Sequence, residues 1–164
     1  MTQITIRPAH ITDAHAMCDV INPLIVEGTT TAHRTLFDAK RAVAHYIEPE
    51  DYISCQVAVS AYRLVGFQSL QWRDRDELPD RTAEIASFVA HDQHGRGVGH
   101  LLFAATLEAA RKAKVVVIGA TIRADNVPGL AFYSKLGFID HTLHKQRPLS
   151  DGTLVDRVQK LFWL

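Results

Sequence analysis

The feature that most constrains the fold of this chain is a glycine-rich hexapeptide, His94-Gly95-Arg96-Gly97-Val98-Gly99. It follows an apolar segment, 83–90, that has the composition of a strand. It precedes a segment, 98–109, whose apolar residues recur at helical spacing. Where a strand turns into a helix, successive backbone N–H groups converge and the helix dipole adds partial positive charge. The hexapeptide is therefore predicted to bind a pyrophosphate.

The surrounding residues narrow the type of phosphate site. An NTP-binding loop ends in Lys-Ser or Lys-Thr, which the hexapeptide lacks. A dinucleotide-binding fingerprint spaces its three glycines more widely and follows the first strand of its domain, whereas this hexapeptide follows the fourth predicted strand. Arg96 can add a direct cation to the site. The alternative that the glycines only permit a tight turn is left open.

The rest of the chain alternates between predicted strands and helices. Strands are predicted at 2–7, 53–59, 64–72, 83–90, 115–121, around Leu143 and at 154–164, and helices at 12–28, 38–48, 98–109 and 126–136. The β-branched run 115–121 is typical of a strand that is covered on both sides. This order favours an α/β (α+β) fold, with a mixed sheet and helices on both faces.

Composition limits the domain organisation and the partners. The chain has 164 residues, 47% of them apolar, with no repeat or linker, so we expect one domain over residues 1–164. Its 18 basic and 18 acidic residues give a formal net charge of zero, which favours a small-molecule partner over nucleic acid or a membrane. Because we find neither a signal peptide nor an apolar stretch of about 18 residues, the expected location is cytoplasmic.

The histidines do not predict a metal site. His91 and His94 are three residues apart, as are His141 and His144. Neither pair lies in a convincing helix, and neither has a third ligand at a suitable spacing. The two cysteines match no zinc or dithiol spacing either. We therefore expect no metal.

The hexapeptide, Asn126 and the later segment Tyr133-Ser134-Lys135-Leu136-Gly137-Phe138 together resemble the GNAT superfamily of N-acetyltransferases. Within it, the chain looks most like the branch that acetylates phosphinothricin and methionine sulfoximine. His94 stands where the superfamily usually has Gln or Arg, and His91 stands where many relatives have proline. The resemblance implies a mixed, mostly antiparallel central sheet of about seven strands. Because relatives in the superfamily are commonly homodimers, the resemblance also implies a homodimer.

The resemblance implies acetyl-CoA as the cofactor and a set of residues that bind it. These residues are the hexapeptide 94–99, Phe88, Val89, Ala90, Asn126 and Lys135. A main-chain N–H near Val89 is expected to polarise the thioester carbonyl, as an oxyanion donor does. Asn126 is expected to meet the pantetheine arm, and it can also serve as the N-cap of the following helix.

Two side chains are candidates for proton transfer. An alkyl ammonium has a pKa near about 10, so a base must take its proton before the amine can attack a thioester. Glu84, in the apolar run before the hexapeptide, is the candidate base, and the resemblance agrees. Tyr133 matches the general acid of many superfamily members, although the phosphinothricin branch often has histidine there. The alternatives are a solvated carboxylate for Glu84 and a core tyrosine for Tyr133.

The acceptor side is expected to involve the loop after the first helix and the segment after the third strand. Thr30 and Thr31 resemble the threonine-containing loop of the phosphinothricin branch, and Arg73 and Arg75 can clamp a carboxylate. A hydrated surface loop is the alternative. The predicted function is transfer of acetyl to the primary amine of a small molecule, such as an amino acid or its analogue. The alternatives are acetylation of protein N-termini, or a non-catalytic CoA-binding regulatory module.

Overall fold

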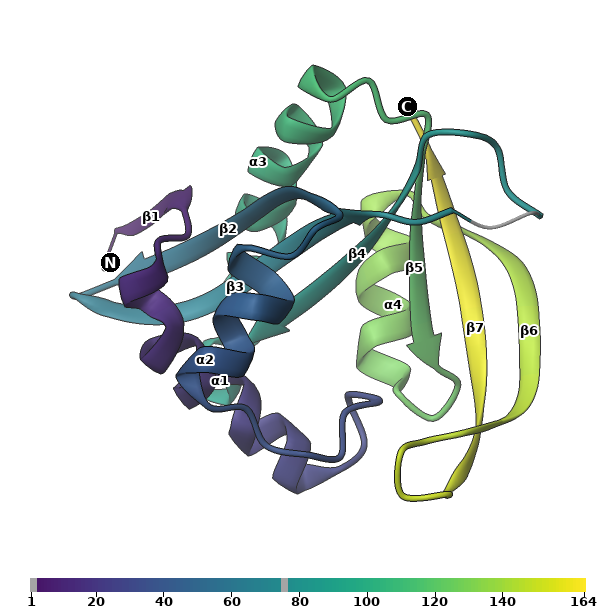
Figure 1. Ribbon diagram of the computed structural model, residues 1–164, viewed down its shortest axis with the longest axis horizontal. Helices are drawn as coiled ribbons and strands as arrows, with labels where there is room; N and C mark the ends of the chain where they lie inside the picture. The colour runs from purple at the N-terminus through teal and green to yellow at the C-terminus, as the bar shows by residue number, and fades with distance from the viewer. Residues whose placement is uncertain (1–2, 75–76) are drawn as a thin grey trace.

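Seven strands of the described chain form one sheet, in the order β1-β2-β3-β4-β5-β7-β6 (Figure 1). The computed structural model describes residues 3–74 and 77–164. The strands are β1 (Ile4–Pro8), β2 (Tyr52–Ser60), β3 (Arg63–Trp72), β4 (Thr82–Val89), β5 (Val117–Arg123), β6 (Ile139–Pro148) and β7 (Leu154–Trp163). The helices are α1 (Ala14–Glu27), α2 (Ala39–Ala42), α3 (Val98–Lys112) and α4 (Val127–Leu136). Among the strands of the described residues, only β4 and β5 pair in parallel, which confirms the predicted mixed, mostly antiparallel sheet.

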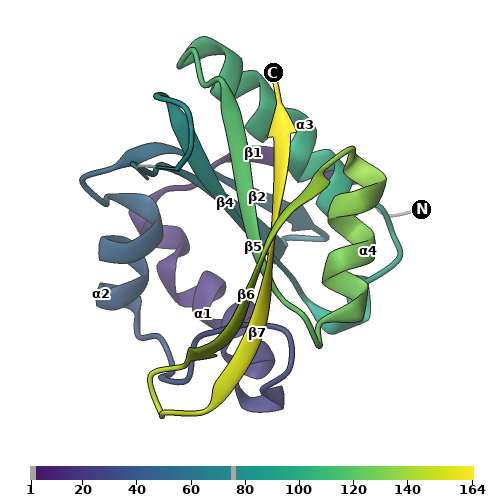
Figure 2. The same cartoon turned by 90° about the vertical axis from the view of Figure 1, so that its right-hand side faces the viewer.

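Helices cover both faces of the sheet, as predicted. Figure 2 shows α1 and α2 on one side of the strands and α3 and α4 on the other. Met17 and Phe67 are fully buried in the core under α1 and α2, and Ile118 and Ala110 are fully buried in the core under α3 and α4. Because the sheet separates these two cores, each face can carry its own binding surface.

The structure differs from the sequence prediction at the ends of several elements, and two of these differences have a clear physical cause. The predicted helix 38–48 is a short α-helix, α2, that continues as a π-helical turn over Val43–Ile47. The predicted strand 115–121 begins later and ends later, as β5. Val116 belongs to the connection, because its N–H donates to the carbonyl of Arg81 before the ladder begins. A run of β-branched residues does not distinguish such a connection from the strand that follows it.

The parallel strands β4 and β5 pair only at their beginnings. Thr82, Ala83 and Glu84 of β4 face Val117, Ile118 and Gly119 of β5, and the ladder has no later pair. Figure 1 shows the two strands diverging beyond this point, with α4 beside them. The second half of β4 therefore has a strand partner on one edge only.

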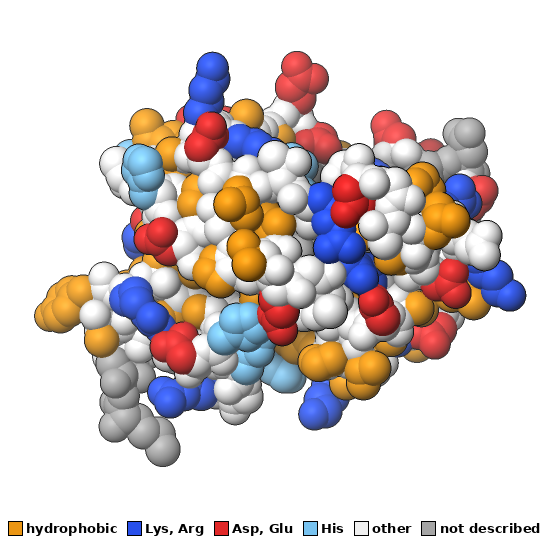
Figure 3. Space-filling model, turned by 90° about the horizontal axis from the view of Figure 1, so that it is seen from below, with side chains coloured by type: hydrophobic (Ala, Val, Ile, Leu, Met, Phe, Trp, Pro, Cys, Tyr) orange, Lys and Arg blue, Asp and Glu red, His pale blue; other side chains and the backbone are white. Residues whose placement is uncertain are grey.

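The surface mixes charges of both signs. On the face seen in Figure 3, acidic and basic side chains are interspersed, and histidine side chains form a group below the centre of the view. The even mixture agrees with the equal numbers of basic and acidic residues in the sequence. Across residues 3–74 and 77–164, none of the helices has the length and apolar character needed to cross a membrane.

The first turn of α3 packs tightly against α4. A Cβ atom built on Gly99 would lie 2.6 Å from Cε2 and 2.8 Å from Cζ of the Phe132 ring. These separations are well below van der Waals contact, so any larger residue at position 99 has to displace the ring. The contact alone explains why glycine occupies this position.

Gly99→Ala is expected to lower the free energy of unfolding. Overpacking against Phe132 costs about 1–3 kcal/mol, and the better helix propensity of alanine recovers up to about 1 kcal/mol. Urea unfolding of Gly99→Ala, Phe132→Leu and the double variant measures the coupling between the two positions. A coupling energy of zero would show that the ring is not the obstacle.

Candidate active site

The glycine turn (94–99) has the backbone geometry of an anion site. Gly95 and Gly97 have φ angles of +75° and +79°, in the left-handed region that favours glycine. No atom lies within 4 Å of the position that a Cβ would take at either residue, so both face open space. Among the described residues, no side chain caps the start of α3. The turn therefore presents main-chain donors at a helix N-terminus, which fits the diphosphate of a coenzyme A molecule.

His94 and Arg96 of this turn have different roles. Nε2 of His94 lies 2.8 Å from the carbonyl oxygen of Val89, to which it donates a hydrogen bond. His94 therefore ties the turn to the end of β4. Arg96 is exposed beside the two left-handed glycines, where it can contact a phosphate. Val98 is buried against the sheet and contributes packing.

The main chain of β4 supplies further donors on the edge that faces β5. The N–H of Ala90 donates to the carbonyl of Val65 at 2.9 Å, on the β3 side. Since N–H directions alternate along a strand, the N–H of Val89 points toward the β5 side. The β4–β5 ladder ends at Glu84, five residues earlier. This orientation is the one that the sequence analysis expects of an oxyanion donor.

Glu84 lies at the last position where β4 and β5 pair. Its Oε1 accepts a hydrogen bond of 2.6 Å from the hydroxyl of Thr121. A Cβ atom on Gly119 would lie 2.9 Å from Oε2, so the absence of a side chain at 119 makes room for the carboxylate. The carboxylate is half-buried, which is the setting that a general base needs. Sequence reasoning missed Thr121 and Gly119, because only the β4–β5 pairing brings them to Glu84.

Tyr133 approaches β4 from the opposite face. Its ring is buried, and its hydroxyl lies 2.9 Å from Oγ of Ser87, which accepts a hydrogen bond from Nε2 of Gln68 at 2.8 Å. Burial raises the pKa of the Tyr133 hydroxyl, and the charge of Glu84 raises it further. The hydroxyl is therefore protonated at neutral pH. Because strand side chains alternate between faces, Glu84 and Ser87 lie on opposite faces of β4, and the two candidate groups flank the diverging strands.

A cavity of about 190 Å³ lies next to Glu84. It is lined by His33, His45, Tyr46, Ser69, Gln71, Trp72, Arg73, Glu84, Ile85 and Ala86. We call it the acceptor cavity. Of the predicted site residues, Glu84 and Arg73 both line it. The sequence analysis did not foresee the histidines or Tyr46, because they come from the loop after α1 and the turn after α2.

His33 is a neutral polar group in the wall of the acceptor cavity. Its Nε2 lies 2.9 Å from the hydroxyl of Tyr46. Burial is the main cause that lowers the pKa of His33 to about 4, and the nearby His45 and Arg41 contribute to the same shift. At neutral pH the imidazole is therefore uncharged, and it can donate or accept one hydrogen bond toward a bound molecule.

The two predicted threonines hold the loop after α1 in place. The carbonyl of Thr30 accepts a hydrogen bond of 3.2 Å from Nδ2 of Asn126. The hydroxyl of Thr31 accepts one of 3.1 Å from the N–H of His33. Neither threonine is among the described residues that line the acceptor cavity. Arg75, the second predicted clamp, lies outside the described residues.

The remaining predicted cofactor residues occupy three different settings. Asn126 is the N-cap of α4, since its Oδ1 accepts a hydrogen bond from the N–H of Gly129. The Phe88 ring is buried in the core under α1 and α2, and its main-chain N–H faces β3, on the same edge of β4 as that of Ala90. Lys135 is exposed on the last turn of α4.

The pKa of His33 predicts a loss of stability in mild acid. In the unfolded chain a histidine takes up its proton near pH 6.5, whereas folded His33 does so only near pH 4. The unfolded state thus binds one more proton in this window, so stability falls as the pH drops from about 6.5 to about 4. Thermal unfolding across these pH values should show a shallower fall for His33→Gln. Parallel curves for the two proteins would contradict the assignment.

Comparisons with known proteins agree with this geometry. A family model described as the acetyltransferase (GNAT) domain matches residues 3–139. The matched range includes β4, the glycine turn, α3 and α4. No curated protein sequence shows a significant match to the chain.

Solved structures share the fold over nearly the full chain. A ribosomal-protein-alanine N-acetyltransferase from Brucella melitensis has a TM-score of 0.82 at 24% identity, over 98% of this chain and 99% of that one. The Salmonella typhimurium protein yncA, a proposed acetyltransferase solved with its cofactor acetyl-CoA, has a TM-score of 0.85 at 22% identity, over 98% and 94%. A protein proposed to be a phosphinothricin N-acetyltransferase has a TM-score of 0.83 at 22% identity, over 99% of both chains.

These identities are low, so the solved structures establish the fold and leave the acceptor undetermined. The family model covers most of the chain, and the segment that it matches contains the glycine turn with its two left-handed glycines before α3. The chain accordingly belongs to the GNAT acetyltransferase family and is an acetyl-CoA-dependent N-acetyltransferase.

Proposed function

We propose that the protein acetylates the primary amine of a free amino acid or of an amino-acid analogue such as phosphinothricin or methionine sulfoximine. The observation that carries the proposal is the size and polarity of the acceptor cavity. Its volume of about 190 Å³ is below the range of about 300–1,000 Å³ that is usual for drug-sized ligands. A cavity of this size suits one small molecule, held by a few polar groups.

The charges around the acceptor cavity complement those of an amino acid. Glu84 supplies a carboxylate for the amino group, and Arg73, exposed at the surface, supplies a guanidinium for the carboxylate. His33 and Gln71 add neutral hydrogen-bonding groups for a polar side chain. This arrangement favours an acceptor that carries both an amine and an acid.

The chemistry requires the acceptor ammonium to lose two protons and the departing sulfur to gain one. Bound acetyl-CoA supplies the acetyl group as a thioester. Glu84 takes the proton of the acceptor amine, so that the nitrogen can form the new C–N bond. The N–H of Val89 donates to the carbonyl oxygen as charge develops there. As the C–S bond breaks, Tyr133 gives its proton to the sulfur. The nitrogen of the new amide loses a second proton to water, and exchange with water removes the proton from Glu84 and returns one to Tyr133. The ammonium thus loses two protons, of which one is matched by the proton on the coenzyme A thiol and one is released to solvent, so the reaction is balanced.

Acetylation of protein N-termini is the second candidate. The fold likeness to the ribosomal-protein-alanine N-acetyltransferase from Brucella melitensis favours it, because that likeness is as strong as the one to the proposed phosphinothricin enzyme. A thiol-release screen with acetyl-CoA, comparing amino acids, their analogues, polyamines and short peptides, separates the two candidates. Turnover of peptides together with no turnover of free amino acids would reject the first.

Glu84→Gln is expected to lower kcat at neutral pH by about 100-fold or more, the usual scale for the loss of a general base. The substitution leaves the glycine turn intact, so acetyl-CoA affinity should stay within about twofold of the wild type. Glu108→Gln, on the exposed surface of α3, is the matched control and should keep wild-type kinetics. An unchanged rate in Glu84→Gln would rule out the role of base.

Gly97→Ala is expected to weaken acetyl-CoA binding. The added methyl group enters the open space in which the diphosphate is proposed to lie. Gly152→Ala is a matched control, because Gly152 also has a positive φ, +85°, and also faces open space. Both variants should lose similar stability, roughly 1–2 kcal/mol, from the left-handed backbone. Calorimetric titration with coenzyme A should show lower affinity in Gly97→Ala only; equal affinity in both variants would argue against the site.

A further inference from the structure

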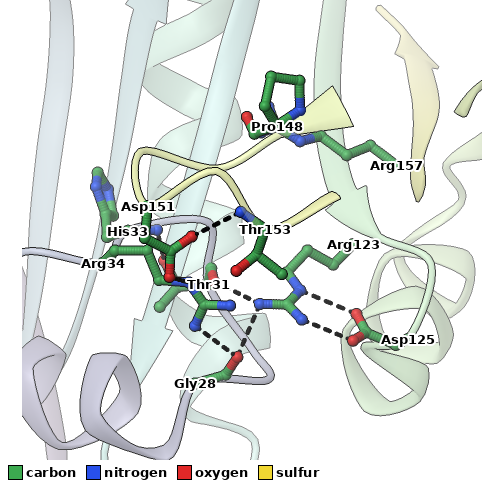
Figure 4. Close-up of polar contacts among 10 residues, drawn as sticks. All are labelled: Gly28, Thr31, His33, Arg34, Arg123, Asp125, Pro148, Asp151, Thr153 and Arg157. Carbon is green, nitrogen blue, oxygen red and sulfur yellow. Dashed lines mark hydrogen bonds and ion pairs between the residues drawn. The ribbon is translucent and has the colours of Figure 1, made fainter. Parts of the chain in front are cut away.

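Arg123 is a buried arginine that joins three segments of the chain. It is the last residue of β5, and its side chain is 7% exposed. On one side, Nε and Nη2 donate to the two oxygens of Asp125, at 2.9 and 2.7 Å. On the other side, Nη1 donates to the carbonyls of Gly28 and Thr31, at 2.8 and 3.3 Å (Figure 4). One guanidinium therefore connects the β5–α4 turn to a loop more than 90 residues away in sequence.

The contribution of Arg123 to the stability of the fold does not by itself explain this arrangement. Desolvation of a buried charge offsets much of the attraction within an ion pair, so apolar residues of similar volume often serve stability equally well. The geometry of a guanidinium is different, because its fixed fork of donors holds several acceptors in defined directions. Here the guanidinium donates to two main-chain carbonyls of the loop, those of Gly28 and Thr31.

The loop that Arg123 contacts, residues 28–33, is held by further hydrogen bonds from neighbouring residues. We call it the acceptor loop. Gly28 ends α1 with a φ of +83°, and its carbonyl also accepts a hydrogen bond of 3.0 Å from Nη1 of Arg34. Asn126, three residues after Arg123, holds the carbonyl of Thr30. Figure 4 shows the guanidinium groups of Arg34 and Arg123 converging on Gly28.

The acceptor loop carries one wall of the acceptor cavity. The carbonyl of Thr31 accepts a hydrogen bond from Arg123, and the hydroxyl of Thr31 accepts one from the N–H of His33. The His33 ring then lines the same cavity as Glu84 and contacts Tyr46. A continuous series of contacts thus runs from Arg123 through Thr31 to a side chain of the cavity.

We propose that Arg123 is a positioning residue for the acceptor site, which fixes the acceptor loop so that His33 forms the wall opposite an acceptor bound at Glu84. The proposal rests on the proposed function, because it takes the cavity as the acceptor site. Arg123 itself does not line the cavity as described. Its effect is therefore on acceptor binding, through the loop.

The test compares the kinetics of Arg123→Met with those of Asp125→Asn. Arg123→Met removes the hydrogen bonds to the loop and should raise the KM of the acceptor by about tenfold or more, the scale expected for hydrogen bonds to a charged group. The KM of acetyl-CoA and kcat should stay within about threefold. Asp125→Asn weakens the ion pair and leaves the loop contacts, so the KM of the acceptor should remain at the wild-type value. Arg123→Lys should recover only part of the loss, because lysine lacks the fork.

A second readout does not depend on activity. Amide hydrogen exchange of the free protein should accelerate at residues 29–33 in Arg123→Met and stay unchanged there in Asp125→Asn. If Arg123→Met alone fails to fold, Arg123→Met combined with Asp125→Asn removes both charges and provides the same comparison. An unaltered KM of the acceptor in a folded variant, or exchange that accelerates throughout the sheet, would overturn the proposal.

The two readouts also separate this proposal from the proposed function. If the wild type acetylates no amine in the screen, the assignment of the cavity to an acceptor fails, and the role of Arg123 at an acceptor site fails with it. Accelerated exchange confined to 29–33 would then identify Arg123 as a structural residue of the loop only. If the wild type is active and only the KM of the acceptor changes, both proposals stand.

Discussion

The divergence of β4 and β5 after the Glu84–Gly119 pair is the constraint on which the rest of the site depends. Had the parallel ladder continued, the main-chain donors on that edge of β4 would be used within the sheet. Instead the N–H of Val89 faces the β5 side without a ladder partner in the described chain, and Tyr133 reaches Ser87 there. The main-chain donor expected to polarise the thioester carbonyl and the two candidate proton-transfer groups therefore lie in the same part of the sheet.

The glycine turn and the acceptor cavity lie on opposite faces of the sheet. Val98 of the glycine turn packs with Leu102 of α3 and with Val65 of β3, whereas the acceptor cavity lies on the side of α1 and α2. The alternation of side chains along β4 directs Glu84 to one face and Ser87 to the other. The turn at 123–126 touches both sides, since Asn126 caps α4 and also holds the acceptor loop.

Most of the fold could be predicted because its signals are local. Apolar periodicity, the caps Asp38 and Asn126, and the left-handed glycines at 28 and 137 mark helix ends without reference to the rest of the chain. The π-helical turn after α2 and the shifted start of β5 were not predicted, because packing and pairing with distant segments determine both. Gly99 shows the same limit, since its need for glycine comes from a ring on another helix.

The sequence by itself determined the strand–turn–helix that presents main-chain donors, the carboxylate on the preceding strand and the asparagine that caps α4, because each depends on residues within a few positions of one another. Only the tertiary structure decided which side chains surround that carboxylate. Thr121 and Gly119 reach Glu84 through the sheet register, and His33 reaches the cavity through a loop that Arg123 holds. Contacts between segments so far apart leave no local pattern, because the folded chain brings them together only when the sheet and both helical layers have formed.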